Sequence, residues 1–373
     1  MTQRLPTALT PLDAALRLLL EGVEPVEPID VSLEDSVGGV AAAVIVEAPH
    51  PAFNVAVFDG WALRARDIVG ASSYSPLPLP APPVWVEAGD RVPGDCDCVL
   101  DADLVDETGP IFQVLAESFP GLGIRRAGDD IAAGCSIVAP GTRVNAFNML
   151  VARAAGFDRI PVRSPRVGVI DVPSADRNTA SSQFMLKFAQ AAGAQAVGLQ
   201  AKGRDAASIS AALEGDAYDL LITVGGTGMG RTDTTIAALA ERGARLIHGL
   251  AVQPGRTAAV GKIGRVPIIA APGAPEQALA ACLMLLQPAL DRFTARSPRR
   301  EMVRPLARKI SSSIGVAEIV LLETLDETWM PIAAGQLSLG AIAGADAWLA
   351  VPGDSEGYAA GTTVGGLSLR DMM

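Results

Sequence analysis

Between residues 166 and about 295, short apolar runs that are typical of buried strands alternate with longer stretches of helical periodicity. The first kind includes RVGVIDV and DLLITVGG, and the second includes SSQFMLKFAQAAGA and PEQALAACLMLL. Consecutive parallel strands need a crossover segment between them, and a helix is the usual one. The alternation therefore predicts an α/β domain in which a parallel-rich sheet is wrapped by helices.

The segments on either side of this region predict other structure. A helix is expected over 9–22, where Thr10 would cap the N-terminus and Pro11 would take the first helical position. From about 26 to 140, short runs separated by Pro and Gly predict a β-rich segment, and helical periodicity returns over 146–157. The tail from residue 300 onward again has a strand-like pattern. A chain of 373 residues, 49% of them hydrophobic, can bury several such domains.

Charge and cysteine usage exclude several classes of protein. The net charge is -11 and no long Lys/Arg run occurs, so we expect no nucleic-acid partner.

The apolar stretch 278–286 is too short to span a bilayer and ends before Pro288, so we expect no membrane role. Four scattered cysteines form neither a disulfide framework nor a zinc pattern. Reduced thiols and a cytoplasmic location are the simplest interpretation.

The string DLLITVGGTGMGRTDTT at 219–235 is the most informative for function. It predicts a buried strand that ends at Val224, a glycine loop, and a helix that begins near Thr234. Backbone amides in such a loop can bind an anion at the carboxyl end of a sheet. Asp233 could coordinate a divalent cation that bridges to phosphate, or could cap the helix. The spacing argues against a P-loop, and an ordinary structural turn is the competing interpretation.

Several segments resemble, in the same order, those of the MoeA/gephyrin E-domain family. GGTGMGRTD resembles the pterin-phosphate loop of the molybdopterin-binding fold, where an Asp follows eight positions after the first Gly. Further matching segments are HPAFNVAVFDGWALRARD (50–67), AGDRVPGDCDCVLDAD (88–103), IRRAGDDIAAGCSIVAPGTRV (124–144), PGRTAAVGK (254–262) and APGAPEQALAA (271–281). Together these collinear matches cover nearly the whole chain.

The resemblance implies a homodimer and a multidomain α/β architecture. Its expected parts are a helical linker domain (1–45 plus 141–165), an inserted β-rich domain (46–140), a molybdopterin-binding α/β domain (166–297) and a C-terminal β-barrel domain (298–373).

The resemblance also implies an activity. Family members insert molybdate into the dithiolene of adenylylated molybdopterin and cleave the adenylate with a divalent metal. We therefore expect a molybdopterin molybdenumtransferase with Mg²⁺ as cofactor and with molybdopterin, in its adenylylated form, and molybdate as substrates. The expected protein partner is a molybdopterin adenylyltransferase or a client molybdoenzyme.

The functional residues carried over by the resemblance fall into two groups. The expected catalytic carboxylates are Asp59, Asp130 and Asp233, of which Asp59 and Asp233 would bind the metal. Ordinary turn chemistry is the competing interpretation of Asp59 and Asp130, which both lie close to glycines. The expected cofactor-binding residues are Gly225, Gly226, Thr227, Gly228, Gly230, Arg256, Pro272 and Gly273.

Departures from the family pattern concentrate where molybdate would bind. QPGRT replaces KPGKP, so Gln253 removes one positive charge while Arg256 retains the other. Ala274 replaces the Asn of PGNP, and Leu321 and Gly335 align with an oxyanion-binding Arg and Ser. A desolvated dianion needs several converging donors. Two other functions are therefore alternatives to the transferase. One is a non-catalytic molybdopterin or molybdenum cofactor carrier with a degraded molybdate site. The other is an adenylyltransferase, which the GGTG sequence suggests.

Overall fold

A computed structural model describes residues 3–175, 178–213 and 218–370. The chain divides into two compact units. One unit comprises Met1–Ala42, Pro140–Asn145 and Arg159–Met373, and the other comprises Ala43–Ala139 and Ala146–Asp158. The finer division into four domains stays a prediction. Among the described residues, no helix has both the length and the apolar character that a membrane crossing requires.

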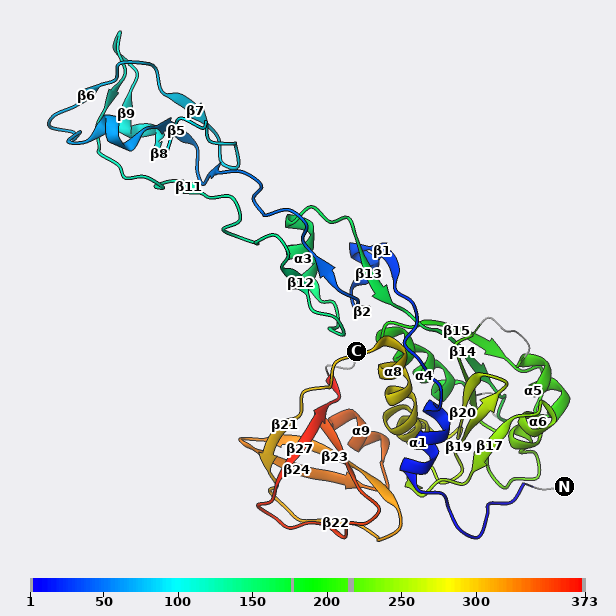
Figure 1. Cartoon of the computed structure of the whole chain (residues 1–373). Coiled ribbons are helices and arrows are strands. Elements are labelled where there is room, and N and C mark those ends of the chain that lie inside the picture. The colour runs from blue at the N-terminus through cyan, green and yellow to red at the C-terminus, as the bar shows by residue number, and fades with distance from the viewer. Residues whose placement is uncertain (1–2, 176–177, 214–217, 371–373) are drawn as a thin grey trace. The chain divides into compact units, whose positions relative to one another are not determined.

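A six-stranded sheet forms the centre of the first unit (Figure 1). Its strands, in spatial order, are β15 (Gln195–Gln200), β14 (Arg166–Asp171), β16 (Leu220–Val224), β20 (Val266–Ala271), β19 (Ala259–Ile263) and β17 (Arg245–His248). β15, β14, β16 and β20 are parallel, whereas β19 and β17 run antiparallel to their neighbours. The predicted parallel-rich sheet is therefore present, and two antiparallel strands extend it at one edge.

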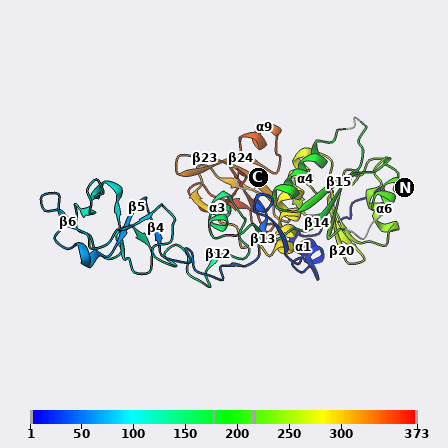
Figure 2. The ribbon, with the colours of Figure 1, turned by 90° about the horizontal axis from the view of Figure 1, so that it is seen from above.

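Helices cover both faces of this sheet (Figures 1 and 2). Successive strand residues face opposite sides, so Leu220 and Ile222 of β16 pack into one core while Leu221 packs into another. The first core contains helix α1 (Leu12–Leu20), α4 (Ala180–Ala191), α7 (Pro275–Ala281), the π-helical segment η3 (Cys282–Leu286) and α8 (Gln287–Thr294). The second contains α5 (Ala206–Ala212) and α6 (Thr235–Glu241).

The C-terminal strands form a second sheet within the first unit. It contains β18 (Val252–Gln253), β23 (Ala317–Leu325), β25 (Ala347–Val351), β27 (Thr363–Ser368) and β21 (Met302–Pro305), with β24 (Thr328–Ala334) paired to β23. Helix α9 (Leu339–Gly344) and the short pair β22 (Ile310–Ser311) and β26 (Gly357–Tyr358) complete this region. Trp329, which is fully buried, lies in the core of this part. Closure of these strands into a barrel stays a prediction.

The start of helix α1 differs from the prediction. Pro11 is the cap residue and the helix begins at Leu12, so Thr10 does not cap it. Thr10 instead pairs through its backbone with the segment after β17: its N–H donates to Gly249 (2.9 Å), and its carbonyl accepts from Ala251 (2.7 Å). The remaining elements of this unit are β1 (Ile29–Ser32), α2 (Leu33–Ser36), β2 (Val40–Ala41) and β13 (Arg159–Arg163).

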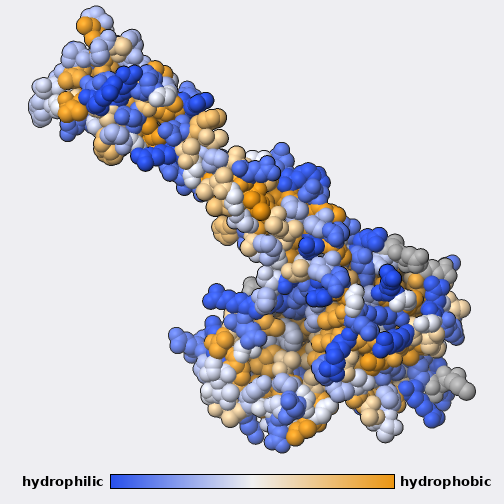
Figure 3. Space-filling model, viewed as in Figure 1, coloured by the Kyte–Doolittle hydropathy of each residue, from blue (hydrophilic) through white to orange (hydrophobic). Residues whose placement is uncertain are grey.

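The second unit consists of short strands, as its Pro- and Gly-rich sequence predicts. They are β3 (Val44–Ile45), β4 (Val55–Ala56), β5 (Gly60–Leu63), β6 (Leu77–Pro78), β7 (Val84–Val86), β8 (Cys98–Asp101), β9 (Val105–Asp106), β10 (Gln113–Val114), β11 (Ile124–Arg125) and β12 (Ser136–Val138). The helical pieces are η1 (Ala65–Ile68), η2 (Ala102–Leu104) and α3 (Ala146–Ala154). Hydrophilic and hydrophobic residues are interspersed on the viewed face of each unit (Figure 3).

Ile222 lies at the middle of the central sheet and is fully buried. We predict that Ile222→Ala lowers the free energy of unfolding by about 2–5 kcal/mol, because the sheet cannot close the cavity left behind. Ile314→Ala, at a side chain that is 66% exposed in the same unit, should change it by less than about 0.5 kcal/mol. Urea denaturation followed by a probe in this unit would measure both. Equal losses would contradict the packing described here.

Candidate functional site

A cavity of about 890 Å³ opens at the carboxyl ends of β14, β16 and β20. Open α/β sheets usually bind their ligands at this edge. The lining comes mainly from the ends of β14, β15, β16, β18, β20 and β24 and the segments that follow them. It includes Asp171, Gly225, Gly226, Thr227, Gly228, Arg204, Asp233, Gln253, Arg256, Pro272, Gly273, Gln277 and Gly335. The structure thus brings together most of the residues predicted to bind the cofactor, although Gly230 is not among those that line the cavity.

The loop after β16 needs its first two glycines. Gly225 and Gly226 have φ values of 101° and 68°, which side chains disfavour. A Cβ on Gly226 would lie 2.4 Å from Oγ1 of Thr235. That hydroxyl donates to the carbonyl of Gly225 (2.8 Å), and the Thr235 N–H donates to the carbonyl of Gly226 (3.1 Å). The first turn of α6 therefore holds the beginning of the loop.

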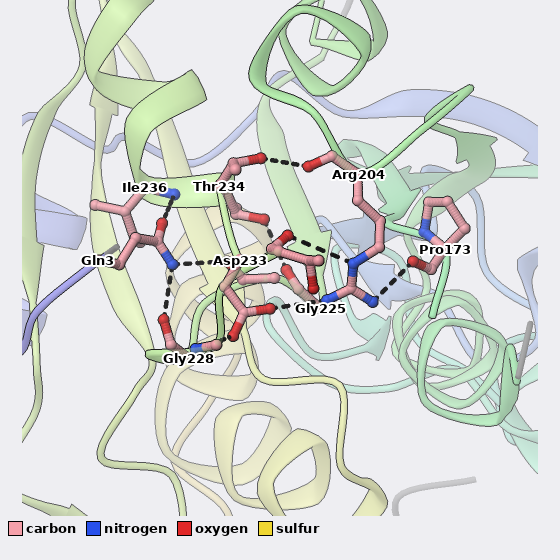
Figure 4. Close-up of polar contacts among 12 residues, drawn as sticks. Gln3, Pro173, Arg204, Gly225, Gly228, Asp233, Thr234 and Ile236 are labelled. Atoms are coloured by element: carbon pink, nitrogen blue, oxygen red, sulfur yellow. Dashed lines mark hydrogen bonds and ion pairs between the residues drawn. The ribbon is translucent and has the colours of Figure 1, made fainter. Parts of the chain in front are cut away.

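Two side chains from distant parts of the sequence hold the rest of the loop. Nε2 of Gln3 donates to the carbonyls of Gly226 (3.0 Å) and Gly228 (2.8 Å), and its Oε1 accepts from the N–H of Ile236 (2.8 Å), as Figure 4 shows. Nε2 of His248, at the end of β17, lies 3.0 Å from the carbonyl of Thr227. A carbonyl can only accept, so this nitrogen carries a hydrogen.

Asp233 lies inside the turn and is committed to protein donors. Its Oδ1 pairs with Nη2 of Arg204 (2.8 Å), and its Oδ2 accepts from the N–H of Gly230 (2.9 Å) (Figure 4). Arg204 also donates to the carbonyl of Pro173 (3.0 Å). Thr234 is the cap residue of α6, so the interpretation of Asp233 as a helix cap is wrong. The carboxylate prefers the turn because two donors converge on it there.

The loop after β20 closes the opposite wall. Oγ of Ser181 donates to the carbonyl of Gly273 (2.7 Å), and a Cβ on Gly273 would lie 3.4 Å from Cα of Gly225. Oγ of Ser182 donates to Asp171 (2.7 Å), which ends β14 and lines the cavity. The two serines at the start of α4 thus orient both neighbouring loops.

Among the described residues of the predicted oxyanion region, Arg256 is a cation without an ion-pair partner. Arg256 is exposed and has no side-chain partner within residues 3–175, 178–213 and 218–370, whereas Arg204 is paired with Asp233. Gly335 lines the cavity, and a Cβ there would lie 1.9 Å from Oε1 of Glu318. The serine expected from the family would therefore require that carboxylate to move. Leu321 is fully buried in the core and so does not line the cavity.

The predicted carboxylates Asp59 and Asp130 belong to the second unit, whereas Asp233 belongs to the first. Asp59 is exposed between β4 and β5, and its Oδ1 accepts from the N–H of Ala88 (2.7 Å). Asp130 is exposed and pairs with Arg125 (3.3 Å). Both contacts suit turns of the inserted region, and the catalytic roles stay predictions.

Magnesium has no ready-made site among the described side chains. Within the described ranges, no three His, Cys, Asp or Glu side chains gather as a metal-binding group. Mg²⁺ demands oxygen ligands in near-octahedral geometry. Asp233 is already bonded through both oxygens and Asp59 through one, so a magnesium ion would have to take further oxygen ligands from a bound substrate.

Several residues of the site were not predicted from the sequence. Asp171 and Arg204 follow the adjacent strands β14 and β15, so the rule that strand ends converge at one sheet edge could have identified them. Gln3 lies more than two hundred residues from the loop, and His248 is more typical of a structural strand end. The sequence around Gln3 and around His248 does not indicate that either side chain contacts the loop.

Two family models match the chain. The model for the MoeA N-terminal region (domain I and II) matches residues 10–156. A model described as "Probable molybdopterin binding domain" matches residues 166–292, which contain the central sheet and the loop after β16.

Individual proteins match along most of the chain. Molybdopterin molybdenumtransferase of Bacillus subtilis is 27% identical over 413 residues, covering 97% of this chain and 94% of that protein. Molybdopterin molybdenumtransferase 2 of Mycobacterium tuberculosis is 28% identical over 315 residues, covering 74% and 77%. The solved structure of the molybdopterin biosynthesis MoeA protein from Pyrococcus horikoshii has a TM-score of 0.74 at 22% identity, covering 96% and 99%. The last match shows a common fold.

Alanine substitutions at Gly226 and Gly243 separate the effect of backbone strain from the effect of a steric clash with a neighbouring side chain. Both have positive φ, but a Cβ on Gly243 meets no atom within 4 Å, whereas one on Gly226 meets Thr235. We predict that Gly226→Ala destabilises the protein by about 1–3 kcal/mol more than Gly243→Ala, because only the first forces Thr235 away. Chemical denaturation of the two variants measures the difference. Equal losses of stability in the two variants would mean that backbone strain alone explains the need for glycine at position 226.

Burial lowers the pKa of His248 below its ordinary value, although its hydrogen bonds to the backbone of Thr227 and Thr257 act in the opposite direction. The unfolded chain therefore binds this proton more readily than the folded chain. We predict that stability falls as the pH is lowered from above about 6.5 to below the depressed pKa. His248→Gln keeps a donor and should lose less stability on acidification than the wild type. Parallel urea titrations at about pH 7.5 and about pH 5.5 would detect this, and identical losses would contradict it.

Proposed function

The chain belongs to the MoeA family, and on that premise we propose that it is a molybdopterin molybdenumtransferase of molybdenum cofactor biosynthesis. The proposed reaction inserts molybdate into adenylylated molybdopterin and releases AMP. The observation that carries the proposal is the cavity at the carboxyl edge of the central sheet, with the glycine loop on one wall and Arg256 exposed on another.

Backbone amides are proposed to bind the pterin phosphate. The N–H groups of Thr227, Gly228 and Met229 have no acceptor among the residues that the structure describes. The Thr227 hydroxyl is buried and likewise lacks a partner in that part of the chain, which costs about 1–3 kcal/mol. A phosphate oxygen at the loop would offer the acceptor that these groups lack. Such binding does not require a positive net charge, which suits a chain of charge -11.

Arg256 is proposed to bind molybdate. Its guanidinium offers several donors in a fixed plane, which suits an oxyanion. Gln253, which replaces a lysine of the family pattern, and Gln277 line the same cavity and can add neutral donors. The relatives reported above are named transferases, which favours turnover over a carrier role.

Asp233 is proposed to act at the reacting adenylate, with Arg204 as its positioning residue. The ion pair fixes the carboxylate in the turn next to Gly228 and Gly230. Participation of Asp59 and Asp130, of magnesium, and of a second subunit in a homodimer belongs to the same proposal. So do a cytoplasmic location and partnership with a molybdopterin adenylyltransferase or a client molybdoenzyme.

We predict that Asp233→Asn lowers kcat/KM for molybdate-dependent AMP release by at least about tenfold, because the carboxylate charge is lost at the reacting group. Arg204→Gln breaks the same ion pair but keeps the carboxylate, so its kcat/KM should fall less. Release of AMP from adenylylated molybdopterin, measured with molybdate and Mg²⁺ under anaerobic conditions, compares the two.

Stability and binding supply the controls for this comparison. If both variants lose activity equally and in proportion to their loss of thermal stability, Asp233 is structural. If the wild type binds molybdopterin but releases no AMP, the enzyme proposal is wrong and a carrier function replaces it.

A further inference from the structure

We propose that Gln3 and His248 are positioning residues that orient the loop amides for a phosphate monoester, an inference that rests on the function proposed above. Gln3 holds the carbonyls of Gly226 and Gly228, and His248 holds that of Thr227. Three consecutive peptide groups are thus fixed by donors from outside the loop.

The geometry of the peptide group determines where the loop N–H groups point once these carbonyls are held. In a trans peptide the C=O of one residue and the N–H of the next point in opposite directions. The cis peptide bonds of the described chain are His50–Pro51 and Gln253–Pro254, so the loop peptides are trans. When Gln3 binds the carbonyls of Gly226 and Gly228, the N–H groups of Thr227 and Met229 must point away from Gln3.

His248 acts on the peptide between these two. Its Nε2 binds the carbonyl of Thr227, so the N–H of Gly228 points away from the imidazole. Without these donors the glycine-rich loop could rotate a peptide and present a carbonyl oxygen, instead of an N–H, to a bound anion. A carbonyl dipole facing phosphate is repulsive, whereas an N–H binds it. The two side chains therefore favour the anion-binding orientation.

The carboxamide of Gln3 suits this place because it both donates and accepts. Its Nε2 serves two carbonyls while its Oε1 accepts the N–H of Ile236 in the first turn of α6. An ionised Glu would keep the acceptor and lose both donors. It would also add a negative charge next to the proposed phosphate position. Gln3→Glu is therefore the most discriminating substitution.

Side-chain packing and backbone hydrogen bonds of residues 5–10 hold the segment that carries Gln3. A Cβ on Gly249 would lie 2.8 Å from Pro6 and 3.2 Å from Leu5, so these two residues pack closely on the turn after β17. The backbone of Thr10 bonds on both sides of Leu250. The N-terminal segment is thus fixed to the strand end that carries His248, and both donors reach the loop from one supported region.

The test compares molybdopterin with its enzymatically dephosphorylated form as probes. We predict that Gln3→Ala and Gln3→Glu weaken binding of the phosphorylated pterin by about tenfold or more, with the larger loss for Glu. Binding of the dephosphorylated form should change much less, which a general loss of structure would not produce. Gln183→Ala, an exposed glutamine on α4, is the matched control and should bind both probes as the wild type does.

The remaining outcomes of this binding experiment either overturn the inference or support it. Gln3 variants that keep the full preference for the phosphorylated form, or that bind it more tightly because the side chain blocks the loop, overturn the inference. A wild type without such a preference overturns the proposed phosphate site itself. If Gln3→Ala does not fold, Gln3→Met keeps the side-chain length without hydrogen bonds and is judged by the same ratio. His248→Gln, which retains a donor, should preserve the preference, whereas His248→Ala should reduce it.

Discussion

The site depends on hydrogen bonds to four consecutive backbone carbonyls, those of Gly225, Gly226, Thr227 and Gly228. Each is held by a donor outside the loop. A glycine-rich segment has many accessible conformations, and fixing them is unfavourable in entropy. The surrounding donors offset this cost and fix the direction of every following amide. Strand, helix and N-terminal segment all converge on this one turn.

The same loop explains how an acidic protein can accommodate an anion. Net charge governs long-range attraction, whereas oriented amides act at contact distance and carry no net charge. Of the two arginines that line the cavity among residues 3–175, 178–213 and 218–370, Arg204 is neutralised by Asp233, and Arg256 keeps an exposed positive charge. Under the proposed function, recognition of phosphate rests on the backbone, and recognition of molybdate rests on few side chains. The proposal therefore assigns the departures from the family pattern at Gln253 and Gly335 to molybdate binding, not to phosphate binding.

Local patterns allowed much of this architecture to be predicted, and long-range contacts explain the rest. The strand that ends at Val224, the glycine loop and the following helix are encoded within one short stretch, and the prediction is confirmed. Thr10 follows the rule for a helix cap, yet its backbone is drawn into pairing beside Leu250. Gln3 and His248 have no local signature, because their partners are set by how distant segments meet.

The position of Gln3 bears on how this protein should be handled in the laboratory. Its side chain is part of the loop's hydrogen-bond network, although it stands near the beginning of the chain. A purification tag joined in front of it would place a flexible, charged peptide beside the cavity. Recombinant material for ligand titrations is therefore better tagged at a site away from Gln3, so that the hydrogen-bond network of the loop stays intact.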